Sequence, residues 1–437
     1  MLASRLQLAV AALVVIDFVA ALPTSFLQHN RLDLDHEQPW RRPHYQVSYD
    51  SRPFYIINNM TDSELKAKLQ SCENGPWSIT DFSIGHRGGG TLQFPEETVE
   101  STMAGARMGA GILECDVSFT ADRGLVCRHS FCDLHTTTNI LLYPELAAKC
   151  TVPFTPANAT SPANALCCTS DIATAEFISL CGKQDGFNAS ATNVHDYQSG
   201  TPNWRTELYD TCGTVMTLDS YITLVESIPG KRKFTPELKT PPVQVPMPFN
   251  GYTQEQYARD MLNAFLERGI APERVWAQSF HPPDIYQWIT EYPEFGKQAI
   301  FLDRDGDTPA KYAADVARLS SLKEKGVNIV APPFAYLLTT TGEGNQTIVP
   351  STYATTAKAV GLDVIAWTYE RSGPLATVGS RGEYYFGSIG GAVHFDGQYY
   401  EILDVLARDV GIKAIFSDWS STVGYYANCM GLKYGGF

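Results

Sequence analysis

Short apolar runs rich in β-branched residues recur along the chain and alternate with segments of helical length. They lie at residues 82–86, 112–117, 233–238, 274–279, 298–302, 327–331, 362–367 and 413–417. Such runs, separated by helix-length segments, predict parallel strands joined by crossover helices. The eight runs therefore predict an α/β fold of the TIM-barrel type, a closed (β/α)8 barrel.

The alternation is interrupted at about residues 139–216. This segment holds five of the ten cysteines, two Asn-x-Ser/Thr sequons and many Pro, Asn, Ser and Thr residues. A structureless loop of this length is unusual inside a compact domain. We therefore predict an inserted, disulfide-rich subdomain, with a short helix near residues 171–180, that forms a lid or rim over the barrel mouth.

Residues 1–21 have the pattern of a secretory signal peptide. Arg5 precedes an apolar run over residues 6–20, and small residues follow it. The run contains Asp17 and is short for a bilayer span, so a retained signal anchor is the less favoured alternative. No later stretch is long and apolar enough to cross a membrane. We expect a secreted protein, extracellular or in the cell-wall space, without a transmembrane segment after signal removal.

Residues 22–75 are predicted to be a polar N-terminal leader without a clear period. Three histidines in it, His29, His36 and His44, are irregularly spaced, which favours a solvated leader over a metal site. The barrel, with its insertion, is predicted to occupy residues 76–437.

The composition fits an exported globular protein. Of the 437 residues, 44% are hydrophobic and 18% are charged, which is enough for a large core. The net charge of −14 repels polyanions, so we expect no nucleic-acid partner. The ten cysteines are an even number, and sequons begin at Asn59, Asn158, Asn188 and Asn345. Both features predict a disulfide-bonded glycoprotein of the secretory route.

The candidate chemistry begins at Gly85-His86-Arg87-Gly88-Gly89-Gly90, directly after an apolar run. His86 supplies a titratable imidazole and Arg87 a guanidinium on a glycine-rich backbone, so the segment is a candidate phosphate site. In α/β barrels the carboxyl ends of the strands carry the chemistry, and His86 lies at such an end.

Two acids and a second histidine lie on a predicted hairpin. Glu114 and Asp116 are alternate residues of a strand and point to one face, whereas Cys115 points to the other. The chain then turns through residues 121–124. If two residues form the tip, paired positions sum to 245, and His129 lies opposite Asp116. The hairpin would then bring an imidazole to a pair of acids.

A third acid comes from the run at residues 233–238. Glu237 and Lys239 are again alternate residues and share a face. Three acids at strand ends, with Arg87 and Lys239 among them, would hold a divalent cation and a phosphate in one pocket. Carboxylate ligands favour Ca²⁺ or Mg²⁺ over a transition metal. Each acidic pair taken alone has an ordinary alternative, a solvated strand or an exposed ion pair.

The order and spacing of these motifs resemble the glycerophosphodiester phosphodiesterase family. The matching positions, between about residues 80 and 430, are His86-Arg87-Gly88, Pro95-Glu96-Glu97-Thr98, Glu114-x-Asp116-Val117, Thr120-x-Asp122, His129, Glu237-x-Lys239, Gln278-Ser279-Phe280, Trp367-Thr368 and Ser417-Asp418. The cysteine-bearing insertion and residues 366–373 are most similar to the secreted fungal branch. The chain departs from the family at Glu97, where Asn or His is usual, and at His281, where an acid is frequent.

The resemblance implies a metal-dependent TIM-barrel hydrolase that converts a small-molecule glycerophosphodiester and water into glycerol 3-phosphate and an alcohol. In the family's proposed route, the glycerol 2-hydroxyl attacks phosphorus, and water then opens the resulting cyclic phosphate. The implied cation ligands are Glu114, Asp116 and Glu237. The implied phosphate ligands are Arg87 and Lys239, the implied acid and base are His86 and His129, and the candidate pocket residues are Glu96, Gln278, Phe280 and Trp367.

Two alternatives stay open at this point. One is a lyase of the phospholipase type that releases the cyclic phosphate as its product. The other is a non-catalytic secreted binding protein on the same barrel. The alcohol half of the substrate is also open, because aromatic residues such as Trp367 and Trp419 could either face a choline or belong to the core.

Overall fold

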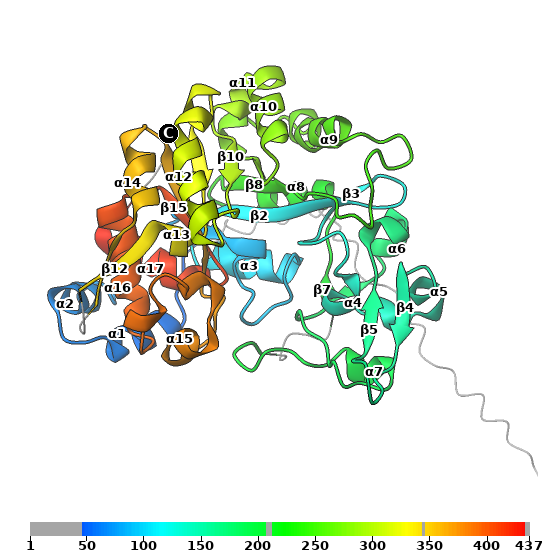
Figure 1. Cartoon of the computed structure of the whole chain (residues 1–437), viewed down its shortest axis with the longest axis horizontal. Helices are drawn as coiled ribbons and strands as arrows, with labels where there is room; N and C mark the ends of the chain where they lie inside the picture. Colours follow the sequence, from blue (N-terminus) through cyan, green and yellow to red (C-terminus); the bar gives the residue numbers. More distant parts are fainter. Residues whose placement is uncertain (1–45, 207–211, 343–345, 433–437) are drawn as a thin grey trace, which may run out of the picture. The chain divides into compact units, whose positions relative to one another are not determined.

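Eight parallel strands close into a barrel in the computed structural model of the chain, which describes residues 46–206, 212–342 and 346–432 (Figure 1). Strand β1 (Thr80–Gly85) pairs with both β2 (Ala110–Phe119) and β15 (Ala414–Ser417), which closes the sheet. The other members are β8 (Lys233–Leu238), β9 (Gln278–Ser279), β10 (Ile300–Leu302), β11 (Ile329–Ala331) and β14 (Asp363–Tyr369). Each predicted apolar run overlaps one strand, so the TIM-barrel prediction is confirmed.

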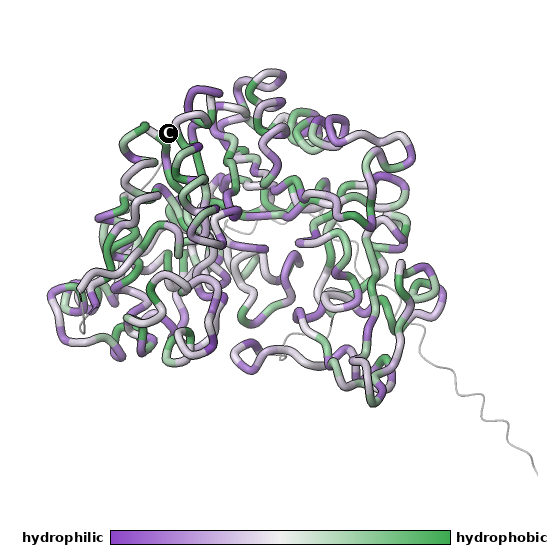
Figure 2. Tube along the Cα trace, viewed as in Figure 1, coloured by the Kyte–Doolittle hydropathy of each residue, from purple (hydrophilic) through white to green (hydrophobic). Residues whose placement is uncertain are grey.

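Helices connect the strands and pack around the barrel. They are α3 (Val99–Arg107), α8 (Leu218–Ser227), α9 (Gln254–Glu267), α10 (Pro282–Glu291), α11 (Pro293–Gly296), α12 (Pro309–Glu324), α13 (Phe334–Leu337), α14 (Thr352–Ala359), α15 (Val378–Arg381), α16 (Gln398–Asp404) and α17 (Ser420–Met430). Threonine hydroxyls at Thr98, Thr253 and Thr308 cap α3, α9 and α12 by accepting a backbone N–H of the first turn. These helices carry both hydrophobic and hydrophilic residues (Figure 2), as expected when one face packs and the other is solvated.

Apolar side chains fill the inside of the barrel. The buried cluster takes one residue or two from six of the eight strands, β8 and β9 excepted, and includes Ile84, Ile112, Ile300, Leu302, Ile329, Ile365 and Phe416. A larger cluster packs between the strands and the surrounding helices. Because the interior is filled, polar chemistry is confined to the strand ends and the loops that follow them.

The hairpin after β2 differs from the predicted register by one residue. Strand β3 (Leu125–Cys127) pairs antiparallel with β2, and Val117 lies opposite Cys127, so paired positions sum to 244. Asp116 therefore faces Arg128, whose N–H donates to the Asp116 carbonyl (2.6 Å). The prediction that His129 lies opposite Asp116 is wrong, because the turn spans residues 120–124 and not two residues.

The ten cysteines form five disulfide bonds. Cys115–Cys127 joins β2 to β3, and Cys72–Cys429 ties the N-terminal segment to α17. The remaining bonds, Cys132–Cys168, Cys150–Cys167 and Cys181–Cys212, hold the insertion.

The insertion consists of short elements around a small core of its own. They are α4 (Leu134–Thr137), α5 (Pro144–Ala147), β4 (Val152–Thr155), β5 (Asn164–Leu166), α6 (Thr174–Phe177), β6 (Cys181–Gly182), α7 (Val194–Tyr197) and β7 (Gly213–Thr214). Helix α6 lies within the region where a short helix was predicted. A separate hairpin of β12 (Leu338–Thr341) and β13 (Thr347–Pro350) precedes α14.

The described part of the predicted leader contains two helices that the sequence pattern did not indicate. They are α1 (Arg52–Asn59) and α2 (Glu64–Gln70). Arg52 forms an ion pair with Glu370 at the end of β14 (2.5 Å), which anchors α1 to the barrel. The predicted signal peptide and the three leader histidines lie outside the described residues. No helix within the described ranges combines the length and the apolar character needed to span a bilayer.

Candidate active site

Three acidic side chains meet at the carboxyl ends of β2 and β8. The register of these neighbouring strands places Asp116 beside Glu237, and Glu114 points to the same face as Asp116. One carboxylate oxygen from each of the three lies within 4.8 Å of the others, and all three residues are buried. The side chains that were expected to bind a cation therefore converge.

These acids carry more negative charge than their neighbours neutralise. Burial raises the pKa of Glu237 to about 8, although Lys239 opposes the shift. Burial and the adjacent acids raise the pKa of Glu114 well above its usual value. No N–H group of the described residues donates a hydrogen bond to either carboxylate oxygen of the buried Asp116. A divalent cation would offset the repulsion among the three carboxylates and coordinate the oxygens that accept no hydrogen bond. The donor set therefore fits a hard cation such as Ca²⁺ or Mg²⁺.

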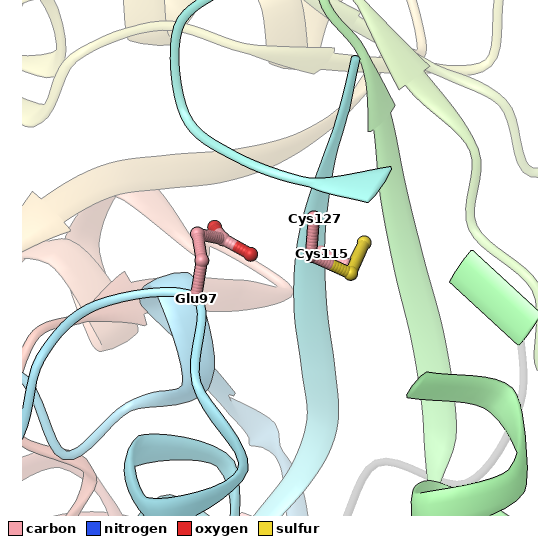
Figure 3. A group of neighbouring side chains, drawn as sticks. All are labelled: Glu97, Cys115 and Cys127. Atoms are coloured by element: carbon pink, nitrogen blue, oxygen red, sulfur yellow. A yellow bond between two sulfur atoms is a disulfide. The ribbon is translucent and has the colours of Figure 1, made fainter. Parts of the chain in front are cut away.

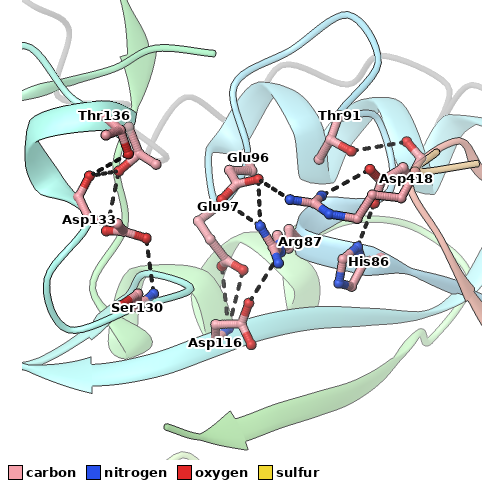
Figure 4. Close-up of polar contacts among 12 residues, drawn as sticks. His86, Arg87, Thr91, Glu96, Glu97, Asp116, Ser130, Asp133, Thr136 and Asp418 are labelled. Carbon is pink, nitrogen blue, oxygen red and sulfur yellow. Dashed lines mark hydrogen bonds and ion pairs between the residues drawn. The ribbon is translucent and has the colours of Figure 1, made fainter. Parts of the chain in front are cut away.

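His86 lies directly after β1, between Glu114 and Asp418. Its Nδ1 donates to Oδ1 of Asp418 (2.5 Å; Figure 4). Its Nε2 lies 4.0 Å from Oε2 of Glu114. Because Asp418 engages Nδ1, the free ring nitrogen is Nε2. Burial lowers the pKa of His86 to about 4, against the opposing effect of Asp418, so the ring is neutral near neutral pH.

The glycine-rich loop after His86 is shaped by close packing. A Cβ atom at Gly89, where φ is +89°, would lie 2.6 Å from Cα of Gly85. The N–H groups of Arg87, Gly89 and Gly90 donate to acceptors within the protein. The glycines therefore allow the tight turn, and these three N–H groups do not form a free cradle for phosphate.

Arg87 and Lys239, the expected phosphate ligands, both line the cavity beside acids. Nη1 of Arg87 donates to both oxygens of Glu96 at 2.8 Å (Figure 4), and Nζ of Lys239 lies 2.6 Å from Glu237. Glu96, a candidate pocket residue, has a carboxylate oxygen within 4.8 Å of a ring nitrogen of His129. It lies behind Arg87 because the guanidinium holds its carboxylate there, and it does not line the cavity.

His129 lines the same cavity as His86, although it does not face Asp116 across the hairpin. Its pKa is held well below the ordinary value, first by burial and then by the positive charges of Arg87 and Lys239. The two imidazoles therefore share one cavity and differ in their electrostatic surroundings.

Glu97 is buried behind β2 with φ at +58°. Its carboxylate oxygens lie 3.4 Å from the backbone nitrogen of Asp116. Figure 3 shows the carboxylate near Cys115 and Cys127, but these sulfurs are joined in a disulfide and cannot act as thiolate ligands. Burial, followed by the charge of Asp116, raises the pKa of Glu97 well above its usual value. This acid therefore lies against the backbone of the ligand strand, outside the cavity lining.

Two of the acids, Glu114 and Glu237, line a cavity of about 400 Å³ together with both imidazoles, Arg87 and Lys239. Gln278 donates to Oε1 of Glu114 (2.8 Å) at the cavity floor. The far wall is aromatic and consists of Phe280, Trp367, Tyr384 and Tyr385. The guanidinium carbon of Arg304 lies 4.6 Å from the ring centre of Phe280. None of the described residues of the insertion lines this cavity.

Several residues whose role the sequence left undecided lie outside the cavity. Trp419 and Tyr369 are buried in the core. His281 pairs with Asp284 (3.2 Å) and lines a separate hollow formed with residues 240–247. Phe131 and Phe416 line the main cavity in addition to the four aromatic residues of its far wall.

Three buried charged residues beside His86 had no predicted role. Asp418 follows the last barrel strand, so the strand-end rule could have identified it. Arg371 follows β14 and lies 3.0 Å from Asp418, and Arg205 of the insertion lies 2.6 Å from it. No periodic signal marks Arg205, because the insertion has no regular pattern of its own.

Comparison with known proteins gives a family for this arrangement. The model of the glycerophosphoryl diester phosphodiesterase family matches residues 86–421. A protein of Arthroderma benhamiae named "Extracellular protein" is 44% identical over 250 residues, which cover 57% of this chain and 100% of that protein.

Two solved structures of bacterial proteins are similar to the chain. One, from Silicibacter pomeroyi DSS-3 and assigned to the glycerophosphoryl diester phosphodiesterases, is 17% identical, covers 84% of this chain and 99% of its own, and has a TM-score of 0.53. The other, glycerophosphodiester phosphodiesterase from Agrobacterium tumefaciens str. C58, is 14% identical, covers 78% and 98%, and has a TM-score of 0.42. At these identities the structural likeness concerns the fold alone. The family model, in contrast, spans most of the chain, from the loop of His86 to the helix after Asp418, and the chain therefore belongs to the glycerophosphoryl diester phosphodiesterase family.

Proposed function

We propose that the protein is a secreted, metal-dependent glycerophosphodiester phosphodiesterase that releases glycerol 3-phosphate and an alcohol. The observation that carries this proposal is the convergence of three acids, two imidazoles and two basic side chains at one cavity, which all of them except Asp116 line. These are the groups that displacement at a phosphodiester requires, because negative charge grows on the phosphoryl oxygens along the reaction.

Glu114, Asp116 and Glu237 would hold a divalent cation. When bound, the cation supplies a fixed positive charge that polarises a phosphoryl oxygen. Arg87 and Lys239 would bind the remaining phosphate oxygens, and their ion pairs with Glu96 and Glu237 orient them in advance. The substrate phosphate is thus fixed between side chains that need little rearrangement.

His86 would act as the general base. Asp418 engages Nδ1, so the lone pair of Nε2 is available to accept the proton of the glycerol 2-hydroxyl as it attacks phosphorus. The carboxylate of Asp418 then stabilises the imidazolium that forms, in the manner of the acid in a Ser-His-Asp triad.

His129 would act as the general acid. Its pKa is low partly because Arg87 and Lys239 repel a proton. A bound phosphate anion offsets these charges and favours the protonated ring, which can then donate a proton to the departing alkoxide. Water opens the resulting cyclic phosphate, with the roles of the two histidines reversed.

The five disulfide bonds and the name of the Arthroderma benhamiae relative support secretion. The aromatic far wall supports an alcohol half that packs against rings. A lyase that stops at the cyclic phosphate uses the same groups for its first step, so the products must be identified to exclude it.

Phosphorus NMR of the purified protein with glycerophosphocholine tests the proposal. We expect glycerol 3-phosphate to accumulate, to stop forming with a chelator, and to form again with added Ca²⁺ or Mg²⁺. His86→Ala should abolish turnover, whereas His195→Ala, an exposed histidine of the insertion, should not. A persistent cyclic species would favour the lyase. No turnover of choline, inositol, ethanolamine or glycerol diesters would overturn the proposal.

A further inference from the structure

The insertion sends two polar side chains to the loop behind His86. Both lie in the segment between Cys181 and Cys212, which a disulfide closes. Nε2 of Gln184 donates to the carbonyl of Thr91 (3.3 Å), and Nη1 of Arg205 donates to the same oxygen (3.3 Å). The insertion is therefore fastened to the backbone that follows the histidine loop.

Arg205 also reaches the carboxylate that holds His86. Its Nη2 donates to Oδ2 of Asp418 (2.6 Å), and Oδ1 of the same carboxylate accepts from the His86 ring. Arg205 and Asp418 are both buried, with side chains 5% and 0% exposed. A charge-assisted hydrogen bond without competing water is strong and directional, so it limits rotation of the carboxylate.

Arg371 provides a second contact to Oδ2 of Asp418, at 3.0 Å, and also lies 3.4 Å from Glu96. It is thus shared between two carboxylates, whereas Arg205 directs Nη2 to Asp418 at the shorter distance. If Arg205 were absent, Arg371 would be left with both acids, and Oδ2 of Asp418 would lose its closer donor.

We propose that Arg205 is a positioning residue for the reaction, and that the inserted subdomain is a working part of the active site through it. By fixing the Asp418 carboxylate, Arg205 keeps Nδ1 of His86 engaged and Nε2 directed at the cavity. This inference rests on the proposed function of His86 as a base.

The same junction offers a matched control. Nη2 of Arg381 donates to the carbonyl of Ser372 (2.6 Å), and its guanidinium carbon lies 5.4 Å from the ring centre of Trp204, the residue before Arg205. Arg381 therefore helps to hold the insertion on the barrel without a contact to Asp418. A purely structural role of the junction should be disturbed equally by changes at either arginine.

Kinetics of Arg205→Gln, Arg205→Lys and Arg381→Gln with glycerophosphocholine test the proposal. For Arg205→Gln we expect kcat to fall about tenfold with KM unchanged, the effect of weakening a charged hydrogen bond one step from the base. Arg205→Lys should recover part of the loss, because an ammonium can still donate to Asp418. Arg381→Gln should keep the wild-type kcat. An unchanged kcat in Arg205→Gln, or an equal loss in Arg381→Gln, would overturn the proposal.

A second measurement does not depend on turnover. Proton NMR should detect the Nδ1–H of His86 as a downfield resonance that is absent in His86→Ala. We expect Arg205→Gln to shift or broaden this resonance and Arg381→Gln to leave it in place. If the wild type hydrolyses no diester but the resonance responds as expected, the proposed function fails and the positioning role stands. If the wild type is active and neither kcat nor the resonance responds to Arg205→Gln, the positioning role alone fails.

Discussion

At the level of single residues, Asp418 links His86 to the rest of the fold. Its Oδ1 accepts from the imidazole, and its backbone carbonyl accepts from Thr91 N–H (2.9 Å). In Asp418→Asn the amide nitrogen can donate, which favours the wrong ring tautomer. We expect kcat to fall by about 100-fold or more. Steady-state assays should show this loss, with the exposed Asp409→Asn as the control, and wild-type activity in Asp418→Asn would contradict the proposed base.

The same carboxylate predicts how stability depends on pH. Burial acts to raise the pKa of Asp418, but Arg371 and His86 hold it below the usual value of 3.8. A group whose pKa is lowered by folding stabilises the protein above its unfolded pKa, and this contribution is lost as the pH falls below it. Below about pH 4 the unfolding free energy of the wild type should therefore decrease more steeply than that of Asp418→Asn. Urea unfolding over a pH series measures this, and parallel curves would contradict it.

The position of Arg304 leads to a prediction about which alcohol half of the substrate the enzyme prefers. Its guanidinium covers Phe280, and no carboxylate of the described residues forms an ion pair with it. The positive charge competes with a choline ammonium for the aromatic face. Arg304→Glu should therefore raise kcat/KM for glycerophosphocholine, relative to glycerophosphoglycerol, by about fivefold, a typical cation–π magnitude. Arg123→Glu, which alters an arginine stacked on Tyr252 elsewhere, is the control, and an unchanged ratio would exclude this role.

At the level of elements, the disulfide Cys181–Cys212 is predicted to support activity as well as stability. It closes the segment that carries Arg205, whereas Cys150–Cys167 closes another part of the insertion. Removing either bond should cost about 3 to 4 kcal/mol of unfolding free energy, because the entropy of loop closure varies only weakly between separations of 31 and 17 residues. Only the Cys181→Ser, Cys212→Ser variant should also lower kcat. Assays at a temperature where circular dichroism shows both variants folded separate the two effects, and equal kcat values would contradict the prediction.

The barrel strands could be predicted because each is an apolar run between helical segments, a pattern that survives without tertiary information. The hairpin register could not. The Thr120 hydroxyl bonds with Asp122 and accepts Gly124 N–H, while Arg123 takes φ +66°, and this widens the turn beyond two residues. Helices α1 and α2 were missed because each is short, and much of their stability comes from packing against the barrel.

The candidate site was predictable where its residues follow strands. The alternation of strand residues placed Glu114 with Asp116 and Glu237 with Lys239, and the structure brings all four together. The ion pair of Glu96 with Arg87 was not predictable, because the loop that carries Glu96 follows no regular pattern. Arg205 could not be identified, since only the folded insertion brings it to Asp418.

At the scale of the whole molecule, the site is a local exception to the overall charge. The chain carries a net charge of −14, yet four basic side chains gather around the histidines: Arg87 and Arg205 are buried, and Lys239 and Arg371 are partly buried. Burial strengthens their effect because water screens them less. A small anionic diester is therefore attracted at close range, whereas the overall field repels large polyanions.

The charge distribution of the whole molecule also leads to a prediction about cation binding. Two groups of three acids in the described residues have ligand oxygens within 4.8 Å, Glu114 with Asp116 and Glu237, and Asp303 with Asp305 and Asp315. Arg318 lies within 3.2 Å of all three acids of the second group and neutralises part of their charge. Burial raises the pKa of Glu237 to about 8 and that of Asp315 to about 7, so the pKa shifts do not separate the two groups. What separates them is Arg318, since no single basic side chain of the described residues pairs with all three acids of the first group.

We therefore expect Ca²⁺ or Mg²⁺ to stabilise the fold through the first group. A cation present at 100 times its Kd adds about 2.7 kcal/mol to the unfolding free energy and should raise Tm by several degrees. Asp116→Asn should abolish the increase, because it removes a carboxylate ligand, whereas Asp305→Asn should leave it intact. Differential scanning calorimetry with a chelator and with added cation measures both effects. If Asp305→Asn abolished the increase and Asp116→Asn did not, the cation would bind at the second group, and the cavity of His86 would have to do its chemistry without it.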